Sequence, residues 1–149
     1  MKFLLDTNII LIYLRDQKTK AFIDEHYNPF GTANIPVISV VSIGEINSLA
    51  HRNNWGEKRK KAVEKFYRKC VITDINAKDV LVRYGEIDAF SQGKLSAKPL
   101  GTTARNMGKN DLWIASTASV TNAKLMTTDK DFSHLDGQFL ELVLIELVR

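Results

Sequence analysis

Short apolar runs separated by longer stretches with helical spacing are the feature that most constrains this sequence. The apolar runs occupy residues 3–5, 35–41, 71–75, 124–128 and 140–148, with polar turns between them. Helical patterns lie at about 7–15, 18–26, 42–53, 57–69, 77–92 and 111–120. Strands that alternate with helices, and that lack polar residues at alternate positions, predict an α/β fold with a mostly parallel central sheet flanked by helices on both faces.

The size and composition of the chain fit one globular domain. A chain of 149 residues is long enough to bury a substantial core, so we expect a single domain over residues 1–149. The first apolar stretch is too short for a secretory signal or a membrane span, which predicts a cytoplasmic protein without membrane association. The one cysteine, Cys70, excludes an internal disulfide and a thiolate metal site. We expect residues 92–109, with their Gly, Pro and small polar residues, to form a mobile loop.

Four acidic residues stand at comparable places in this pattern. Asp6 ends the first apolar run, Glu45 falls in the first turn of the helix expected after the second run, Asp111 opens a helix, and Asp129 follows a strand. In an open parallel sheet, ligand sites form outside the carboxyl ends of the strands, so these side chains are expected to converge. Four carboxylates in one cleft repel one another unless cations neutralise them. Oxygen ligands suit Mg²⁺ or Mn²⁺, and three His and one Cys argue against zinc.

Each of these residues also has a purely structural explanation as a helix cap or a turn residue. The alternatives are an N-cap at Asp6, a capping box of Ser42 with Glu45, a cap at Asn110 or Asp111, and an Asx turn at Asp129 or Asp131. Caps alone do not explain why three of these acids stand at strand exits on one sheet edge, where the set could converge. The set therefore favours a metal site that hydrolyses phosphodiester bonds.

Basic residues are concentrated in one segment. Residues 51–69 hold eight Lys or Arg against two Glu, a net charge of +6, whereas residues 110–149 carry −3. This asymmetry predicts a surface that binds a polyanion beside an acidic site. The candidate residues for binding this polyanion are Arg52, Lys58, Arg59, Lys60, Lys61 and Lys109. The alternative is a solvated helix face with Glu57–Lys61 and Glu64–Arg68 pairs.

Four blocks of the sequence, in order, resemble the signature blocks of PIN-domain nucleases. They are "LLDTNIIL", "SIGEI", "NDLWIASTA" and "LMTTDKDF", and the likeness extends over essentially the whole chain. Among PIN-domain proteins the chain looks most like the VapC-type ribonuclease toxins of prokaryotic toxin–antitoxin pairs. The resemblance implies catalytic, metal-binding acids at Asp6, Glu45, Asp111 and Asp129, with supporting polar residues at Asn8, Asn110, Thr127 and Asp131. The last block also allows Asp131 in place of Asp129.

The function implied by this resemblance is a Mg²⁺- or Mn²⁺-dependent endoribonuclease that hydrolyses RNA with water as the nucleophile. It further implies a cognate antitoxin protein, a homodimer, and a tRNA or rRNA element as substrate. The alternatives are a PIN-fold nuclease of RNA processing without an antitoxin, and a catalytically inactive module that binds RNA or protein. A phosphoacceptor receiver domain is disfavoured, because its first strand is followed by adjacent acids and this one is followed by "DTN".

Aromatic side chains beside these segments are candidates for stacking on unpaired RNA bases. We expect Trp55 in this role, because "RNNWGEK" has the composition of an exposed turn between helices. Trp113 follows Asp111 by two positions, and we expect it to pack in the core of its helix. None of the three histidines, His26, His51 and His134, belongs to a signature block, so we expect surface or core roles for them.

Overall fold

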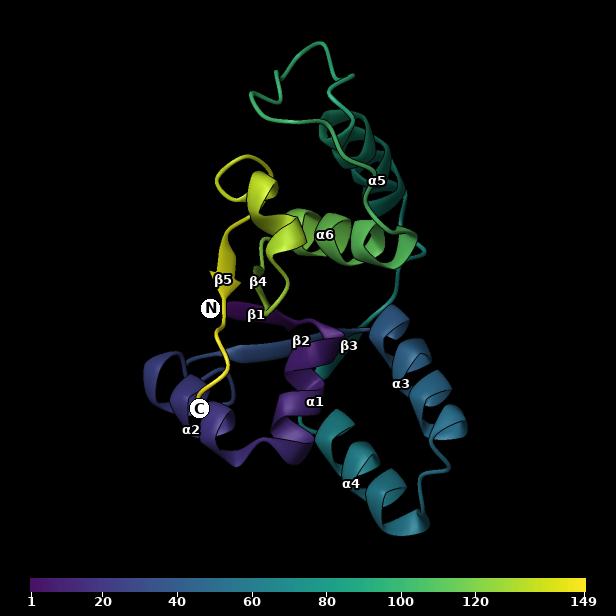
Figure 1. Ribbon diagram of the computed structural model, residues 1–149, viewed down its shortest axis with the longest axis vertical. Coiled ribbons are helices and arrows are strands. Elements are labelled where there is room, and N and C mark those ends of the chain that lie inside the picture. The colour runs from purple at the N-terminus through teal and green to yellow at the C-terminus, as the bar shows by residue number, and fades with distance from the viewer.

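A five-stranded, all-parallel sheet in the order β3-β2-β1-β4-β5 forms the centre of the computed structural model, which describes residues 1–149 (Figure 1). The predicted α/β class and parallel sheet are confirmed. The elements in chain order are β1 (Lys2–Leu5), α1 (Thr7–Arg15), α2 (Gln17–His26), β2 (Ile35–Ser39), α3 (Val40–Arg52), α4 (Glu57–Tyr67), β3 (Val71–Thr73), α5 (Lys78–Ser91), α6 (Lys109–Thr121), β4 (Lys124–Thr127), the 3₁₀ helix η1 (Lys130–Leu135) and β5 (Leu142–Leu144).

Helices cover both faces of the sheet because its strands are apolar at successive positions. Phe3 and Leu5 of β1 pack into one core cluster with residues of α1 to α4, while Leu4 packs into a second cluster with α5, α6 and η1. Figure 1 shows the two layers, with α1, α2 and α4 on one side of the strands and α5 and α6 on the other. No helix combines the length and the apolar content that a membrane span requires.

The second strand ends earlier than the sequence pattern predicted. We expected it to reach residue 41, but Ser39 ends β2 and caps α3, with its hydroxyl accepting the N–H of Val41 at 3.1 Å. The Ser39 hydroxyl thus gives the N–H of Val41 a partner. If β2 continued to residue 41, this N–H would need a partner on a neighbouring strand. Because α3 begins at Val40, Glu45 lies in the second turn of the helix and not in the first.

The last strand is much shorter than the predicted 140–148. β5 covers Leu142–Leu144 and pairs only with β4, whose residues Leu125 to Thr127 face it in register. Since β4 ends at Thr127, residues after Ile145 have no strand beside them with which to continue the ladder. The length of the neighbouring strand, and not the apolar content of the segment, sets the limit of β5.

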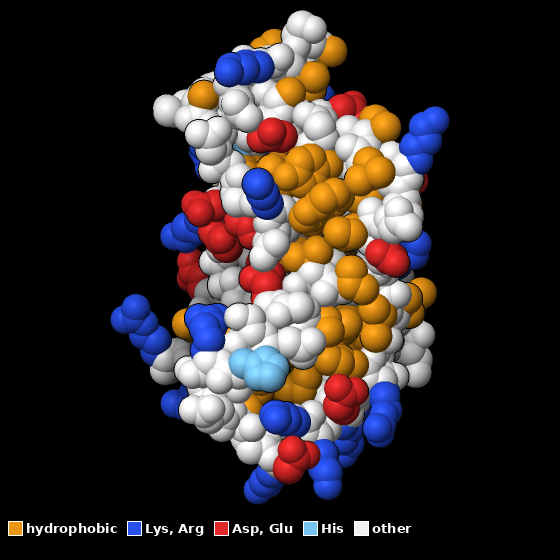
Figure 2. Space-filling view, turned by 90° about the vertical axis from the view of Figure 1, so that its right-hand side faces the viewer, with side chains coloured by type: hydrophobic (Ala, Val, Ile, Leu, Met, Phe, Trp, Pro, Cys, Tyr) orange, Lys and Arg blue, Asp and Glu red, His pale blue; other side chains and the backbone are white.

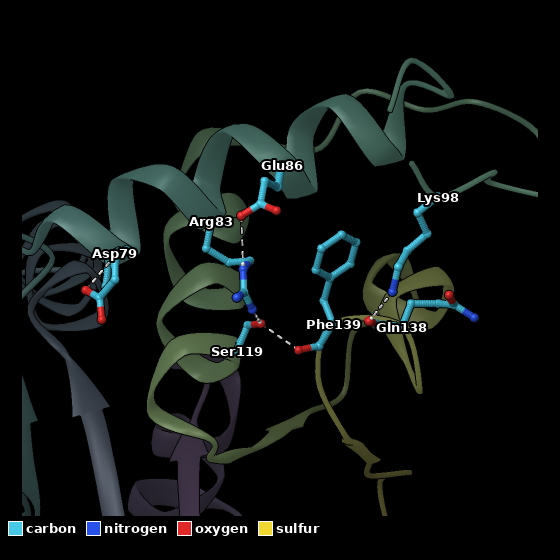
Figure 3. A network of polar contacts seen from close by, with 8 residues as sticks. Asp79, Arg83, Glu86, Lys98, Ser119, Gln138 and Phe139 are labelled. Carbon is cyan, nitrogen blue, oxygen red and sulfur yellow. Dashed lines mark hydrogen bonds and ion pairs between the residues drawn. The ribbon is translucent and has the colours of Figure 1, made fainter. Parts of the chain in front are cut away.

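The segment between α5 and α6 contains neither helix nor strand over residues 92–108, in agreement with the predicted loop. A network of polar contacts beside it holds α5, α6 and the β4–β5 connection together (Figure 3). Arg83 on α5 donates to Ser119 Oγ on α6, and Ser119 donates to the carbonyl oxygen of Phe139 at 2.6 Å. Lys98 of the loop donates to the carbonyl oxygen of Gln138 at 2.7 Å.

Candidate active site

A cleft of about 860 Å³ opens at the carboxyl edge of the sheet, with walls from α1, α3 and α6. All four of the predicted acids line it, and they come from four separate segments of the chain: Asp6, Glu45, Asp111 and Asp129. Figure 2 shows acidic side chains gathered on one part of this face, next to a band of apolar side chains. The expected convergence of the acids at one sheet edge is therefore what the fold produces.

Asp6 is the most buried of the four acids, with 6% of its surface exposed. It follows β1 directly and caps α1, because Oδ1 accepts the backbone N–H of Thr7 at 2.8 Å. Its second oxygen, Oδ2, accepts the hydroxyl of Thr127 at 2.7 Å. Burial raises the pKa of this carboxyl, although both hydrogen bonds act in the opposite direction. Asp6 thus has the structural role of a cap and also faces the cleft.

Glu45 is held by a chain of hydroxyl groups and does not cap α3. Thr7 Oγ1 lies 2.9 Å from Glu45 Oε1 and 2.9 Å from Ser42 Oγ. A hydroxyl has a single hydrogen, so Thr7 donates to the carboxylate and accepts from Ser42. The predicted capping box of Ser42 with Glu45 is wrong, because the N-cap of α3 is Ser39 and Ser42 already lies inside the helix. Glu45 therefore stays available to the cleft.

Asp111 has no hydrogen bond that would explain its position. It lies in the first turn of α6, whose N-cap is Gly108 and which has no side-chain cap, so the predicted cap at Asn110 or Asp111 is absent. Burial, together with the charges of Asp6, Asp129 and Glu45, raises the pKa of the Asp111 carboxyl to about 6. This half-buried carboxylate contributes charge to the cleft and no cap to its own helix.

The last block of the sequence places Asp129 at the cleft and leaves Asp131 exposed outside it. Asp129 Oδ1 accepts the N–H of Asp131 at 2.9 Å, which is the predicted turn and caps η1. Its own N–H donates to Thr127 Oγ1 at 3.0 Å. Since Thr127 also donates to Asp6, this one buried hydroxyl connects the two acids that follow β1 and β4.

Other predicted site residues divide between the cleft and surfaces away from it. Asn8, Asn110 and Arg52 line the cleft, and Asn8 accepts a long hydrogen bond of 3.5 Å from the N–H of Thr128. Lys109 is exposed at the first position of α6. The remaining basic candidates are exposed on the first turns of α4 and do not line the cleft: Lys58, Arg59, Lys60 and Lys61.

The two tryptophans have the opposite environments from those expected. Trp55 is buried with 8% exposure between α3 and α4, where it joins a core cluster and carries Arg59 over its ring at 5.2 Å. The polar residues around it in the sequence hid this packing role. Trp113 is half-buried and lines the cleft. Thr7 and Ser48 also line the cleft, and only the "DTN" motif gave a signal for Thr7.

The donor set of the cleft fits Mg²⁺ or Mn²⁺ in its chemistry, since the four carboxylates supply oxygen ligands and their mutual repulsion favours a cation. As the side chains stand, no group of three His, Cys, Asp or Glu lies close enough together to hold one ion. Binding of one ion by three of these groups would therefore require rotation of side chains. Asp111 makes no side-chain hydrogen bond that opposes rotation, and Glu45 has a single partner, Thr7.

Comparisons with known proteins support one family. The model of the PIN domain family matches residues 3–138. Among curated proteins, no relative matches this sequence. Similar folds include VapBC2 from Rickettsia felis bound to a promoter DNA fragment, with a TM-score of 0.78, 22% identity, and coverage of 98% of this chain and 100% of that chain.

Two further solved structures have the same fold. VapBC-1 from nontypeable Haemophilus influenzae gives a TM-score of 0.71 at 24% identity, covering 97% of this chain and 98% of that one. VapBC-5 from Mycobacterium tuberculosis, described as a member of a family of toxin–antitoxin systems, gives 0.63 at 19% identity, covering 97% and 98%. At these identities the likeness concerns the fold.

Proposed function

Because this chain belongs to the PIN domain family, we propose that it is a Mg²⁺- or Mn²⁺-dependent endoribonuclease and the toxin of a toxin–antitoxin pair. The observation that carries this proposal is the placement of Glu45 and Asp111. Both face the cleft, and neither caps a helix or forms an ion pair. A structural explanation accounts for Asp6 and Asp129 but leaves these two carboxylates without a role, whereas a metal site uses all four.

In this proposal the four acids hold the metal, which supplies activation of water and stabilisation of the charge that develops during phosphodiester hydrolysis. The hydroxyls of Thr7 and Thr127 hold the carboxylates of Glu45 and Asp6 in place at the cleft. Orienting hydrogen bonds of this kind raise the precision of a metal site. Asn8, Asn110 and the guanidinium of Arg52 line the same cleft, where they can contact the RNA backbone.

Metal-dependent cleavage of RNA tests this proposal directly. We expect the purified chain to cut RNA with Mg²⁺ or Mn²⁺, to stop when EDTA is added, and to leave 5′-phosphate and 3′-hydroxyl ends. A catalytically inactive binding module would bind RNA without cutting it under any metal. Cleavage that persists in EDTA would exclude the carboxylate site as its source.

An antitoxin partner is supported by solved structures with this fold, which include a toxin–antitoxin complex from Klebsiella pneumoniae and a member of the VapBC family of toxin–antitoxin systems. We propose that a small antitoxin covers the cleft and blocks RNA. Co-expression with the product of the neighbouring reading frame is expected to give a stable complex without nuclease activity. If no neighbouring product binds and the chain still cuts RNA, the alternative of an RNA-processing nuclease without an antitoxin is the better description.

We also propose a homodimer in the cytoplasm that acts on a tRNA or rRNA element. Apolar side chains support self-association: Val71 and Ile72 on the edge strand β3, and Leu81 and Val82 on α5, are each about half exposed, at 50–55%. Size-exclusion chromatography with light scattering tests the dimer. Sequencing of RNA ends after brief expression tests the target, and cuts scattered through mRNA with intact tRNA and rRNA would contradict it.

A further inference from the structure

Trp113 lies beside the acids, and its surroundings indicate what form of RNA the cleft accepts. The side chain is half-buried and lines the cleft with Asp111, two positions earlier on α6. The ring of Tyr84 on α5 packs against the indole, with 4.4 Å between ring centroids and 48° between the planes. Trp113 is thus supported by one aromatic neighbour while part of its surface remains open to the cleft.

The helices that carry this aromatic pair are fixed to each other. Arg83, which precedes Tyr84 on α5, donates to Ser119 on α6, and Figure 3 shows these side chains directed toward each other. Ser119 in turn donates to the carbonyl oxygen of Phe139. Because these contacts restrain α5 against α6, Tyr84 remains packed on Trp113. The indole is a preorganised surface that loses little conformational entropy when it binds a ligand.

Part of the cleft wall is apolar, and phosphate binding does not explain this part. Leu11, Val41, Leu49 and Ile75 line it together with Trp113 and the acids. Arg52, Asn8 and Asn110 can contact the RNA backbone, but the apolar side chains offer nothing favourable to phosphate groups. The flat face of a base, in contrast, gains from contact with apolar and aromatic surface.

We propose that Trp113 stacks on an unpaired base next to the phosphate that is cleaved, so that the cleft selects single-stranded or looped RNA. In a duplex the neighbouring base pairs cover both faces of each base, whereas an unpaired nucleotide exposes them. This inference deepens the proposed nuclease function and rests on it. It assigns to Trp113 the stacking role that the sequence suggested for Trp55, which the core makes inaccessible.

The fluorescence of Trp113 tests stacking while the indole keeps its contact with Tyr84. The sequence has two tryptophans, so a chain with Trp55→Phe has Trp113 as its single reporter, and Asp111→Asn in the same chain prevents cleavage during the titration. We expect oligo(A) to quench this fluorescence in a saturable manner and an oligo(A)·oligo(U) duplex to leave it nearly unchanged. Equal quenching by both probes, or by neither, would overturn the proposal.

Affinity measurements give a second, independent test. Loss of a stacking side chain is expected to weaken binding of oligo(A) by roughly 5- to 150-fold in Trp113→Leu, and to change duplex binding much less. Trp113→Phe keeps a ring and is expected to restore most of the affinity. Thermal unfolding of both variants separates this effect from weaker packing against Tyr84, because a merely structural role lowers stability without changing the preference for the unpaired probe.

The outcome also distinguishes this inference from the proposed function. If the unmodified chain cuts RNA with Mg²⁺ but Trp113→Leu binds oligo(A) as tightly as Trp113→Phe does, the stacking role is wrong and the nuclease stands. If no metal supports cleavage while oligo(A) quenches Trp113, the nuclease proposal fails and the cleft is a site that binds single-stranded RNA.

Discussion

The cleft and helix α4 carry charge in two contrasting ways. The cleft assembles four acids from four separate segments, and its hydrogen bonds join residues as far apart as Asp6 and Thr127. Helix α4 presents Lys58, Arg59, Lys60 and Lys61 from one continuous exposed run. Burial makes each carboxylate depend on its neighbours, whereas exposed cations act independently through a screened field. We therefore expect substitutions in the cleft to change the rate of cleavage and those on α4 to change the affinity for RNA.

The largest expected effect is the loss of cleavage in Asp111→Asn. Asp111 caps nothing, so the amide preserves shape and leaves α6 intact while removing one of the four carboxylates of the proposed metal site. We expect kcat to fall by about 10³-fold or more. Removal of one oxyanion-hole donor lowers kcat by about 10²–10³-fold, and we expect the loss of this carboxylate to have at least as large an effect. Asp131→Asn, in the same acidic region but exposed outside the cleft, is the matched control and is expected to keep near-normal activity.

The pH dependence of stability is the next effect and concerns the metal-free protein. The folded-state pKa of Asp111 is raised from 3.8 to about 6, so the folded chain binds this proton more tightly than the unfolded chain does. The free energy of unfolding therefore falls as pH rises through the range of about 4–6, and Asp111 destabilises the fold above it. We expect Asp111 to lower the free energy of unfolding at neutral pH by roughly 1–3 kcal/mol, a range that its partial exposure keeps small.

Urea unfolding of the metal-free chain at about pH 4.5 and pH 7, for the wild type and Asp111→Asn, measures this difference. The variant is expected to lose less stability than the wild type as the pH rises, and to be the more stable of the two at neutral pH. An equal change in the free energy of unfolding with pH for the two proteins would show that folding does not raise the pKa of Asp111.

A smaller loss of activity is expected from Thr127→Val. The variant keeps the shape of the side chain but removes the hydroxyl that donates to Asp6 and accepts from the N–H of Asp129. Loss of an orienting partner of a metal ligand typically costs about 10–100-fold in activity or metal affinity. Adding excess Mg²⁺ is expected to restore part of the rate. The control is Thr121→Val, whose hydroxyl donates to the carbonyl oxygen of Thr117 inside α6.

The smallest effects are expected on α4, where they test the other side of the comparison. Replacing Lys58 and Lys61 by Gln is expected to reduce the slope of log K against log salt by roughly 0.7–0.9 for each phosphate that is no longer neutralised, with kcat unchanged. The expected ion pairs Glu57–Lys61 and Glu64–Arg68 are absent, since the structure has only the pairs Arg83–Glu86 and Lys124–Glu141. An unchanged salt slope would show that α4 is a solvated face that does not bind RNA.

The sequence predicted the sheet and most helices because the spacing of apolar residues within a short segment distinguishes a helix from a strand. It also predicted which acids lie together, since Asp6 directly follows β1 and Asp129 lies two residues after β4, and the carboxyl ends of these strands form a single edge of the sheet. It failed where one side chain decides between two local structures. Ser39 rather than Ser42 caps α3, and this choice moved Glu45 from the first turn of the helix to the second.

Burial of individual aromatic residues was the least predictable feature. Polar neighbours suggested that Trp55 is exposed, but the turn that follows α3 folds back, with the N–H of Trp55 donating to the carbonyl oxygen of Ala50 at 3.0 Å. The large area that a tryptophan buries suggested that Trp113 packs in the core, but it lies in the N-terminal half of α6 and lines the cleft. Both outcomes depend on tertiary contacts that short windows of sequence do not contain.

The hydrogen bond between Thr127 and Asp6 has a consequence for the moment at which the chain becomes active. The two residues are 121 positions apart, and β1, which Asp6 follows, pairs with β4 in the centre of the sheet. A ribosome adds roughly 5–20 residues per second, so Asp6 is made about 6–24 s before its partner. Asp111 is added only 16 residues before Thr127, and Asp129 two residues after it. On the proposed function, an unfinished polypeptide cannot damage the ribosome or the transfer RNAs that are still producing it, and only a completed chain needs an inhibitor.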